Sequence, residues 1–181
     1  MNELFDDLEP TIRQAKLSFA DKRYQETIDI CNKILLVNSN SIDACKLIAK
    51  TLVIVGQGEQ AQIYLKRVLN IEPNDLESIK DIANTYKTAG DLYLAKDYYL
   101  KALSLDANYA PALMNLGSIE VKEGNREKGL SLLLKATKCA PNSMQTWANL
   151  ANTYIQLSKL EEAESACLKA VELEPNLFTV H

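Results

Sequence analysis

Four cysteines and one histidine are the side chains of this sequence whose chemistry suits a metal or redox site. No two cysteines form a Cys-x-x-Cys pair, the spacing that zinc sites and thiol oxidoreductases use. The single histidine, His181, is the last residue, where chains are often frayed. The sequence therefore predicts no metal site and no cofactor.

Groups for acid–base or nucleophilic catalysis are also sparse. The sequence has no glycine-rich phosphate loop, no nucleophile elbow and no His-Glu-x-x-His helix. Acidic pairs such as Asp6–Asp7 and Glu161–Glu162 are interpreted as solvated charges or as charges at a helix N-terminus. We predict that the chain is not an enzyme.

The sequence repeats with a period of 34 residues, without insertion or deletion. After a lead-in of residues 1–7, the five blocks are 8–41, 42–75, 76–109, 110–143 and 144–177. The tail, residues 178–181, corresponds to the start of a truncated sixth block. A fixed period of this size indicates one supersecondary unit stacked on itself.

Apolar residues inside each block follow a helical period. In 144–156, Trp147, Leu150 and Tyr154 recur at steps of three and four, which places them on one helical face. A second helical run follows over 161–173. Each block is therefore predicted to be a pair of helices joined by a turn, and the sequence predicts an all-α protein without strands.

Small residues recur at two positions of the block and predict where the paired helices cross. The eighth position holds Ala15, Ala49, Ala83, Gly117 and Ala151, and the twentieth holds Thr27, Ala61, Ala95, Gly129 and Ala163. Turn glycines are Gly56, Gly90 and Gly124, and the prolines expected to end second helices are Pro73, Pro141 and Pro175.

The cysteines stand at block positions that other blocks mostly fill with apolar residues. They are Cys31, Cys45, Cys139 and Cys167. We therefore predict buried, reduced thiols that act as small apolar side chains. A Cys31–Cys45 disulfide is the alternative, because consecutive helices could bring these two residues together.

The repeats resemble those of the tetratricopeptide repeat family, whose motif is about 34 residues long. The fifth block carries the motif best, with Trp147, Leu150, Ala151, Tyr154, Ala163, Ala170 and Pro175 at the family's motif positions. The resemblance implies an α-solenoid, a right-handed superhelix of antiparallel helix pairs. It also implies a concave face, lined by the first helix of each pair, that binds another protein or a peptide.

On that face, the resemblance places an excess of positive charge in the first blocks. The charged residues at the implied positions are Glu9, Arg13, Lys16, Asp43, Lys46, Lys50, Glu77, Lys80, Asp81, Lys87 and Lys122. Seven are basic and four are acidic, whereas the whole chain has a net charge of −4. We predict attraction of an acidic segment, and the alternative is that these lysines are simply solvated.

Amide side chains follow in the later blocks. Asn115 and Asn149 share the sixth position, and Asn84 and Asn152 share the ninth. They resemble the asparagine ladder of glycosyltransferases that carry such repeats, in which amides hold extended substrates. An amide both donates and accepts, so it can bind a peptide backbone of any sequence. The alternative is that asparagine is merely tolerated on an exposed helix.

A narrower resemblance concerns the family members that bind chaperone C-termini. Lys80, Asn84 and Asn115 match three of the five residues that clamp a free carboxylate in those proteins. The other two places, where basic residues are expected, hold Gln145 and Asn149. This departure predicts a weakened clamp.

Charge and hydropathy exclude several classes of protein. A pI near 5.1 argues against nucleic acid as a partner, and no apolar stretch approaches the roughly 18 residues of a membrane span. The acidic N-terminus lacks the pattern of a secretory signal, so a cytoplasmic location is expected. At the other end, Leu168, Val171 and Leu173 are predicted to be partly uncovered.

The function predicted from the sequence is a protein-interaction scaffold that binds an extended or acidic peptide. One alternative is the substrate-targeting region of a larger, glycosyltransferase-like enzyme, and another is co-chaperone-like binding of a C-terminal carboxylate. Self-association through the open C-terminal end is a further possibility, as is a fragment of a longer chain. The groove residues expected to take part are Lys46, Lys50, Lys80, Asn84, Asn115, Lys122, Asn149 and Asn152.

Overall fold

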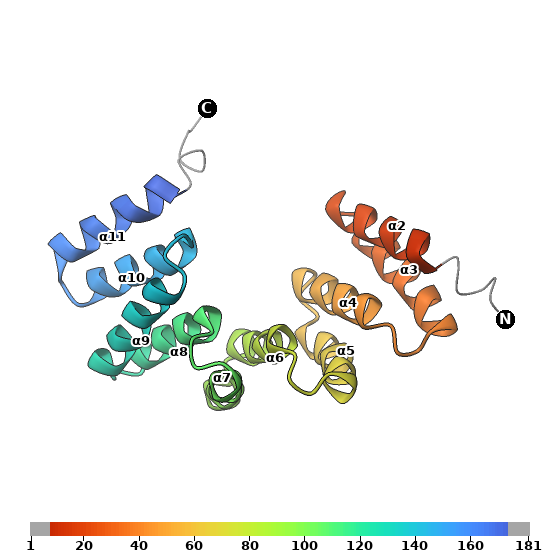
Figure 1. The fold of residues 1–181 in the computed structure, drawn as a ribbon, viewed down its shortest axis with the longest axis horizontal. Helices are drawn as coiled ribbons and strands as arrows, with labels where there is room; N and C mark the ends of the chain where they lie inside the picture. Colours follow the sequence, from red (N-terminus) through yellow and green to blue (C-terminus); the bar gives the residue numbers. More distant parts are fainter. Residues whose placement is uncertain (1–7, 174–181) are drawn as a thin grey trace. The chain divides into compact units, whose positions relative to one another are not determined.

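The computed structural model describes residues 8–173, which form ten α-helices and no strand (Figure 1). The helices are α2 (Leu8–Ala20), α3 (Tyr24–Val37), α4 (Ile42–Ile54), α5 (Gly58–Ile71), α6 (Leu76–Ala89), α7 (Leu92–Leu105), α8 (Ala110–Lys122), α9 (Arg126–Cys139), α10 (Met144–Gln156) and α11 (Leu160–Leu173). The predicted all-α architecture of paired helices is therefore confirmed. None of these helices combines the length and the apolarity that crossing a membrane requires.

The turn inside every pair contains a residue in the left-handed region of the backbone map, at the fifteenth position of the block. Gly56, Gly90 and Gly124 have φ values of 81°, 86° and 90°. Lys22 and Ser158 occupy the same position in the first and last blocks, with φ values of 61° and 59°. Only glycine adopts this region without a steric cost, which explains the glycines that the sequence shows.

Lys22→Gly and Ser158→Gly are each expected to raise the free energy of unfolding by about 0.5–1 kcal/mol. A side chain in the left-handed region costs roughly 1–2 kcal/mol, part of which is offset by the greater freedom of glycine in the unfolded chain. Urea denaturation of each variant measures the change. Gly90→Ala is the reciprocal control and should lose stability, whereas a loss in both glycine variants would contradict the strain argument.

The helix ends follow from capping side chains and prolines. Asp75 precedes α6, and its carboxylate accepts a hydrogen bond of 2.9 Å from the backbone N–H of Ser78. Pro73 and Pro141 follow α5 and α9 by two residues, as expected of a residue that cannot continue a helix. Pro175 lies outside the described residues.

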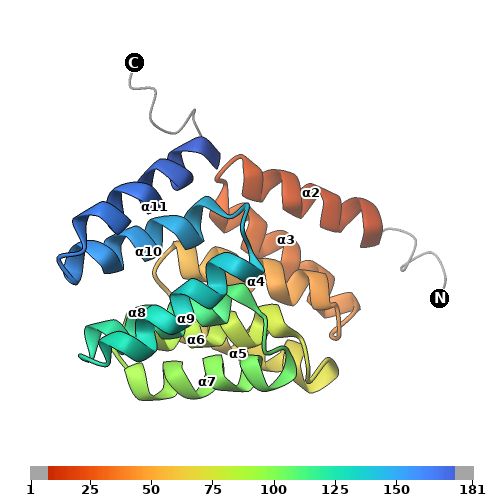
Figure 2. The same ribbon diagram turned by 60° about the vertical axis from the view of Figure 1, so that its left-hand side comes forward.

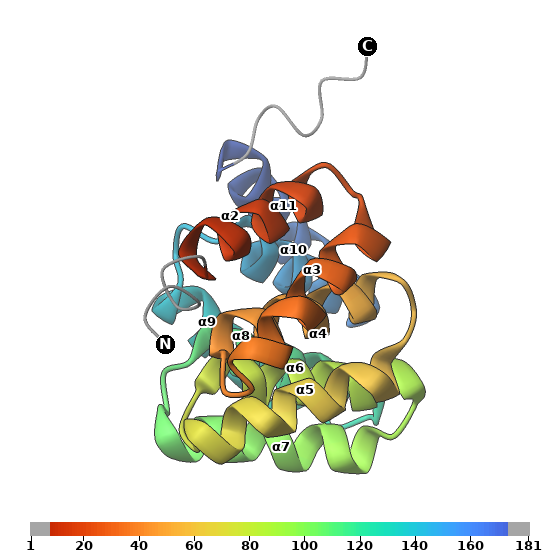
Figure 3. The same cartoon turned by 90° about the vertical axis from the view of Figure 1, so that its right-hand side faces the viewer.

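Contacts divide the chain into two compact units, Met1–Ala95 and Lys96–His181, here called the first and second unit. In the first unit, each helix from α2 to α6 packs on the next (Figure 3). In the second unit, each helix from α8 to α11 does the same (Figure 2). The first helices of neighbouring pairs also touch, α2 with α4 and α8 with α10, so each unit has an inner face built from first helices.

The small residues predicted to mark the helix crossings lie in the core, and at one helix pair they are seen to set a close approach. The residues at the eighth and twentieth positions are all buried. α8 and α9 approach closely, since a Cβ atom added to Gly117 would lie 2.9 Å from the carbonyl oxygen of Gly129. The two glycines therefore set the distance between these helices.

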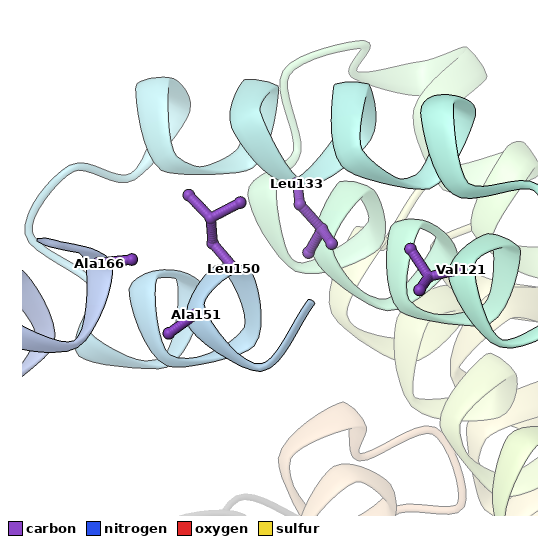
Figure 4. Close-up of a cluster of buried hydrophobic side chains, with 5 residues drawn as sticks. All are labelled: Val121, Leu133, Leu150, Ala151 and Ala166. Carbon is purple, nitrogen blue, oxygen red and sulfur yellow. The ribbon is translucent and has the colours of Figure 1, made fainter. Parts of the chain in front are cut away.

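The core of the second unit is a layer of apolar side chains between the two pairs (Figure 4). Its buried members are Val121 of α8, Leu133 of α9, Leu150 and Ala151 of α10 and Ala166 of α11. Each helix thus contributes to one continuous cluster, which is how stacked repeats bury a face that no single repeat can bury alone.

Candidate peptide-binding surface

The inner face of the first unit is hollowed into a pocket of about 150 Å³. It is lined by Lys16 of α2, by Asp43, Lys46, Leu47 and Lys50 of α4, and by Glu77, Ser78 and Asp81 of α6. Two of the predicted groove residues, Lys46 and Lys50, therefore meet here with four other charged residues of the implied inner face. Leu47 was missed by charge-based reasoning, although it stands at the sixth position, which the resemblance assigns to this face.

The pocket lining holds three lysines and three acidic residues, so it has no positive excess, and two of the lysines form ion pairs. Lys16 Nζ lies 3.1 Å from Asp43 Oδ2, and Lys46 Nζ lies 2.7 Å from Asp75 Oδ1. Burial opposes the charges of the second pair, but their hydrogen bond, their mutual attraction and the further contacts of each group together outweigh it, so the pKa of Lys46 is raised and that of Asp75 is lowered. The predicted local positive charge is therefore partly balanced within the first unit itself.

Lys50 has a different environment from the other pocket lysines. Its side chain is exposed, and Nζ lies 5.2 Å from the centre of the Phe19 ring. Phe19 in turn meets Tyr24 edge to face, with ring centres 6.1 Å apart. A ring positions an ammonium group without neutralising it, so the contact with Phe19 leaves the charge of Lys50 uncompensated by that partner.

The three clamp-like residues are distributed over both units. Lys80 and Asn84 belong to α6 of the first unit, Asn115 belongs to α8 of the second, and all three are half-buried. Lys80 Nζ lies 2.8 Å from Asp81 Oδ1, so an incoming carboxylate competes with that partner. The carboxylate clamp stays a prediction.

Asn115 and Asn149 of the second unit are held by their own helices. Asn115 Nδ2 donates to the Pro111 carbonyl oxygen at 3.0 Å, and Asn149 Nδ2 donates to the Gln145 carbonyl oxygen at 2.8 Å. Ser118 of α8 approaches Asn149 Oδ1 at 3.5 Å. These contacts fix the carboxamide orientations, so a bound backbone would exchange hydrogen bonds with Asn149 rather than simply add them.

Lys122 and Asn152 complete the predicted set in the second unit. Both side chains are exposed, on α8 and α10 respectively. Lys122 is in the last turn of α8, where a cation is favourable to the helix dipole whether or not it binds a ligand. Their roles in binding stay predictions.

A buried charge at Glu120 was missed by the sequence reasoning. Its side chain is inaccessible to solvent and accepts contacts from Lys96 at 3.0 Å, Lys128 at 2.9 Å and Asn125 at 2.7 Å. Burial favours the neutral carboxyl group, but these bonds outweigh it and lower the pKa of Glu120 to about 2. The neighbouring blocks hold Tyr86 and Tyr154 at the same block position. A carboxylate in place of an aromatic side chain was the signal by which the sequence could have revealed this buried charge.

The prediction for the cysteines is confirmed for two and wrong for two. Cys31 and Cys45 are buried, and burial, reinforced by the neighbouring Cys45, raises the pKa of Cys31 to about 12. Cys139 and Cys167 are exposed, and all four are free thiols. Cys139 ends α9, and Cys167 lies on α11, which no later described helix covers. Within residues 8–173, no group of three or more His, Cys, Asp or Glu side chains is placed to hold a metal ion.

Comparisons with known proteins agree with this architecture. Two tetratricopeptide repeat family models match, one over residues 145–177 and the other over residues 81–109. No curated protein sequence matches the chain.

Solved structures with similar folds include tetratricopeptide-repeat proteins. MamA is 18% identical, with a TM-score of 0.72 over 100% of this chain and 98% of the other. TTC0263 of Thermus thermophilus, described as a thermophilic TPR protein, is 21% identical, with a TM-score of 0.79 over 93% and 92%. YrrB, described as a TPR protein with an unusual peptide-binding site, is 20% identical, with a TM-score of 0.65 over 97% and 90%. Together with the paired helices, these likenesses show that the chain has the fold of tetratricopeptide-repeat proteins, and residues 81–109 and 145–177 match the repeat itself.

Proposed function

We propose that the chain is a protein-interaction scaffold that binds an extended peptide on the inner faces of its first helices. The observation that supports this most directly is the pocket of the first unit, in which charged side chains from α2, α4 and α6 converge. Packed helices lie roughly 8–10 Å apart, which is about three residues of an extended chain. An extended segment could therefore place every third side chain opposite a new first helix.

The preferred peptide carries an acidic residue, and Lys50 is the group expected to receive it. Lys16 and Lys46 already have carboxylate partners, whereas the described contact of Lys50 is with an aromatic ring. The preference for acidic peptides is therefore modest and depends on salt concentration, because an exposed ammonium group is screened. The peptide-binding site described for YrrB supports this proposal by analogy of fold.

Lys50→Met is expected to weaken binding of an acidic extended peptide by about five-fold, since one exposed charge pair contributes on the order of 1 kcal/mol. Binding of a neutral peptide of the same length should change little. Fluorescence anisotropy with labelled peptides, selected first from a library of extended sequences, measures both affinities.

Lys66→Met is the matched control, because Lys66 is an exposed lysine of α5, a second helix. Equal losses in both variants, or no binding by any library member, would overturn the proposal. Peptides with free and amidated C-termini form the second arm of the experiment. Binding that requires the free terminus and disappears with Lys80→Met and Asn84→Ala would favour the carboxylate clamp instead.

A further inference from the structure

The outer side of α11 carries an exposed stripe made of Leu160, Glu164, Cys167 and Val171. Their spacing of four, three and four residues places them on one face of the helix. Leu160 is 70% exposed and Val171 is 39% exposed. Leu168 is 59% exposed and Leu173 is half-buried, so the predicted partial exposure of Leu168, Val171 and Leu173 is confirmed. We call Leu160, Glu164, Cys167 and Val171 the α11 stripe.

In the preceding second helices, the matching stripe faces the next repeat. The central residue of the stripe, at the twenty-fourth block position, is buried in every earlier block, as Cys31, Leu65, Tyr99 and Leu133. The first helix of the following pair packs there, α4 on α3, α6 on α5 and α10 on α9. Leu168 does not belong to the stripe. Its equivalents Leu100 and Leu134 are exposed although a helix follows them, so the exposure of Leu168 does not depend on a following helix. The α11 stripe is therefore the surface that the other repeats use to receive a helix.

In two of the four earlier blocks, the second position of the stripe contacts a polar group on the incoming helix; in the other two it is apolar, as Ile28 and Leu130. Lys96, at the twenty-first block position, pairs with Glu120 at 3.0 Å and Glu123 at 2.6 Å, both from the next first helix or its C-terminal cap. At the same position in α5, Gln62 Nε2 donates to Thr85 Oγ1 of α6 at 2.8 Å. Where this position is polar, its side chain thus meets the C-terminal half of the incoming helix and pairs with a polar group there.

Glu164 holds this position in α11, and it is exposed. We propose that the α11 stripe binds an amphipathic helix of a partner protein, with small and apolar residues against Cys167 and Val171 and a lysine or arginine opposite Glu164. This surface is separate from the inner face and goes beyond the peptide binding proposed above. The basic residue is expected on the last turns of that helix, where α8 carries Glu120 and Glu123.

A second copy of this chain fits the α11 stripe poorly. Its first described helix is α2, which exposes Gln14 at a position where Ile48 and Ile82 are buried. The block positions equivalent to Glu120 and Glu123 hold Ser18 and Asp21. Asp21 would face Glu164, and although Arg23 pairs with Asp21 at 3.0 Å, it also pairs with Glu26, so no basic residue is left over for Glu164. Charge complementarity therefore favours a different protein with a basic residue there.

The test uses two synthetic peptides of residues 110–123, capped at both ends. One has the natural sequence, and the other carries Glu120→Lys and Glu123→Lys. Cys167 lies in the α11 stripe and Cys139 is exposed elsewhere, so alkylation of these two thiols, followed by mass spectrometry, reports occupancy together with an internal control. The basic peptide is expected to protect Cys167 but not Cys139, with an apparent Kd roughly ten-fold lower than that of the natural, acidic peptide.

Glu164→Lys should reverse this preference, so that the acidic peptide binds better. Glu172→Lys makes the same charge change at an exposed position of α11 outside the stripe and should leave the preference unaltered. Lys50→Met should also leave it unaltered, which separates this proposal from inner-face binding. Circular dichroism checks that each variant is folded.

Four outcomes would overturn the proposal. The two peptides could protect Cys167 equally, neither could protect it, or Glu172→Lys could act as Glu164→Lys does. In the fourth, Cys167 is protected in the protein without peptide. Sedimentation velocity would then distinguish a second copy, which gives concentration-dependent dimers, from cover by residues 174–181, which leaves a monomer.

Discussion

Gly129→Ala is expected to lower the free energy of unfolding by about 2–3 kcal/mol, although alanine is normally the better helix former. A Cβ atom at Gly129 would lie 2.6 Å from the Gly117 carbonyl oxygen and 2.8 Å from the Val121 backbone nitrogen, and it would also meet Val121 Cγ2. Two of these three atoms belong to the backbone of α8, so a side-chain rotation cannot relieve the contact. The helices must separate, and the core cluster around Leu133 then loses packing.

Gly58→Ala is the control for this substitution. Gly58 begins α5, and a Cβ atom there would lie 3.7 Å from Thr85 Cβ, an ordinary van der Waals contact. We expect its stability to change by less than about 0.5 kcal/mol. Urea denaturation followed by circular dichroism measures both variants. A loss of similar size at the two positions would show that backbone freedom, and not the approach of α8 to α9, explains the glycines.

Glu120→Gln is expected to destabilise the fold by about 2–3 kcal/mol, because it leaves two ammonium groups beside a buried neutral amide. The full effect of breaking a buried ion pair is reduced here, since the side chain of Lys128 is 63% exposed and can turn to solvent. Lys96 is 25% exposed and retains Glu123 as a partner. The main loss is the carboxylate that joins α7, α8 and α9 within the second unit.

The same carboxylate predicts how stability depends on pH. The pKa of Glu120 is about 2 in the folded chain, against an ordinary value of 4.5. Between these values the unfolded state binds more protons, so the stabilising contribution is complete above about pH 4.5 and is lost as the pH falls towards 2. Denaturation at several pH values should therefore show a shallower decline for Glu120→Gln than for the natural chain.

Glu123→Gln is the matched control for the buried carboxylate. Glu123 shares Lys96 as a partner, but its side chain is 33% exposed. Solvent screens this pair, so we expect a loss of about 0.5 kcal/mol and an almost unchanged acid profile. If Glu120→Gln and Glu123→Gln behaved alike, the burial of Glu120 would not be the source of the effect.

The sequence alone was sufficient to predict the helix pairs, their turns and their crossing points. These features depend on residues close together in the chain or at fixed positions of the block. Glycine is favoured at Gly56 and Gly90 because the turn needs a left-handed residue, and small side chains at Ala49 and Ala61 permit close approach. Backbone conformation and helix spacing can thus be predicted from the sequence of one block, and the same prediction applies to the next.

The electrostatics of the candidate surface could not be predicted in this way. The sequence shows the charged residues of the inner face but not their partners, since Lys16 pairs with Asp43 27 positions away and Lys46 pairs with Asp75 29 positions away. Those distances depend on how one helix pair is placed on the next. The sequence therefore predicts an excess of positive charge, and only the tertiary structure shows that ion pairs partly balance it.

Burial at the ends of the repeat array was likewise decided by tertiary structure. Cys31 and Cys167 occupy equivalent block positions, yet the first is buried and the second is exposed. The difference comes from the neighbouring helix: α4 packs on α3, whereas no later described helix packs on α11. A repeating sequence specifies the same local structure in every block, but the surroundings of each side chain depend on which elements lie beside it.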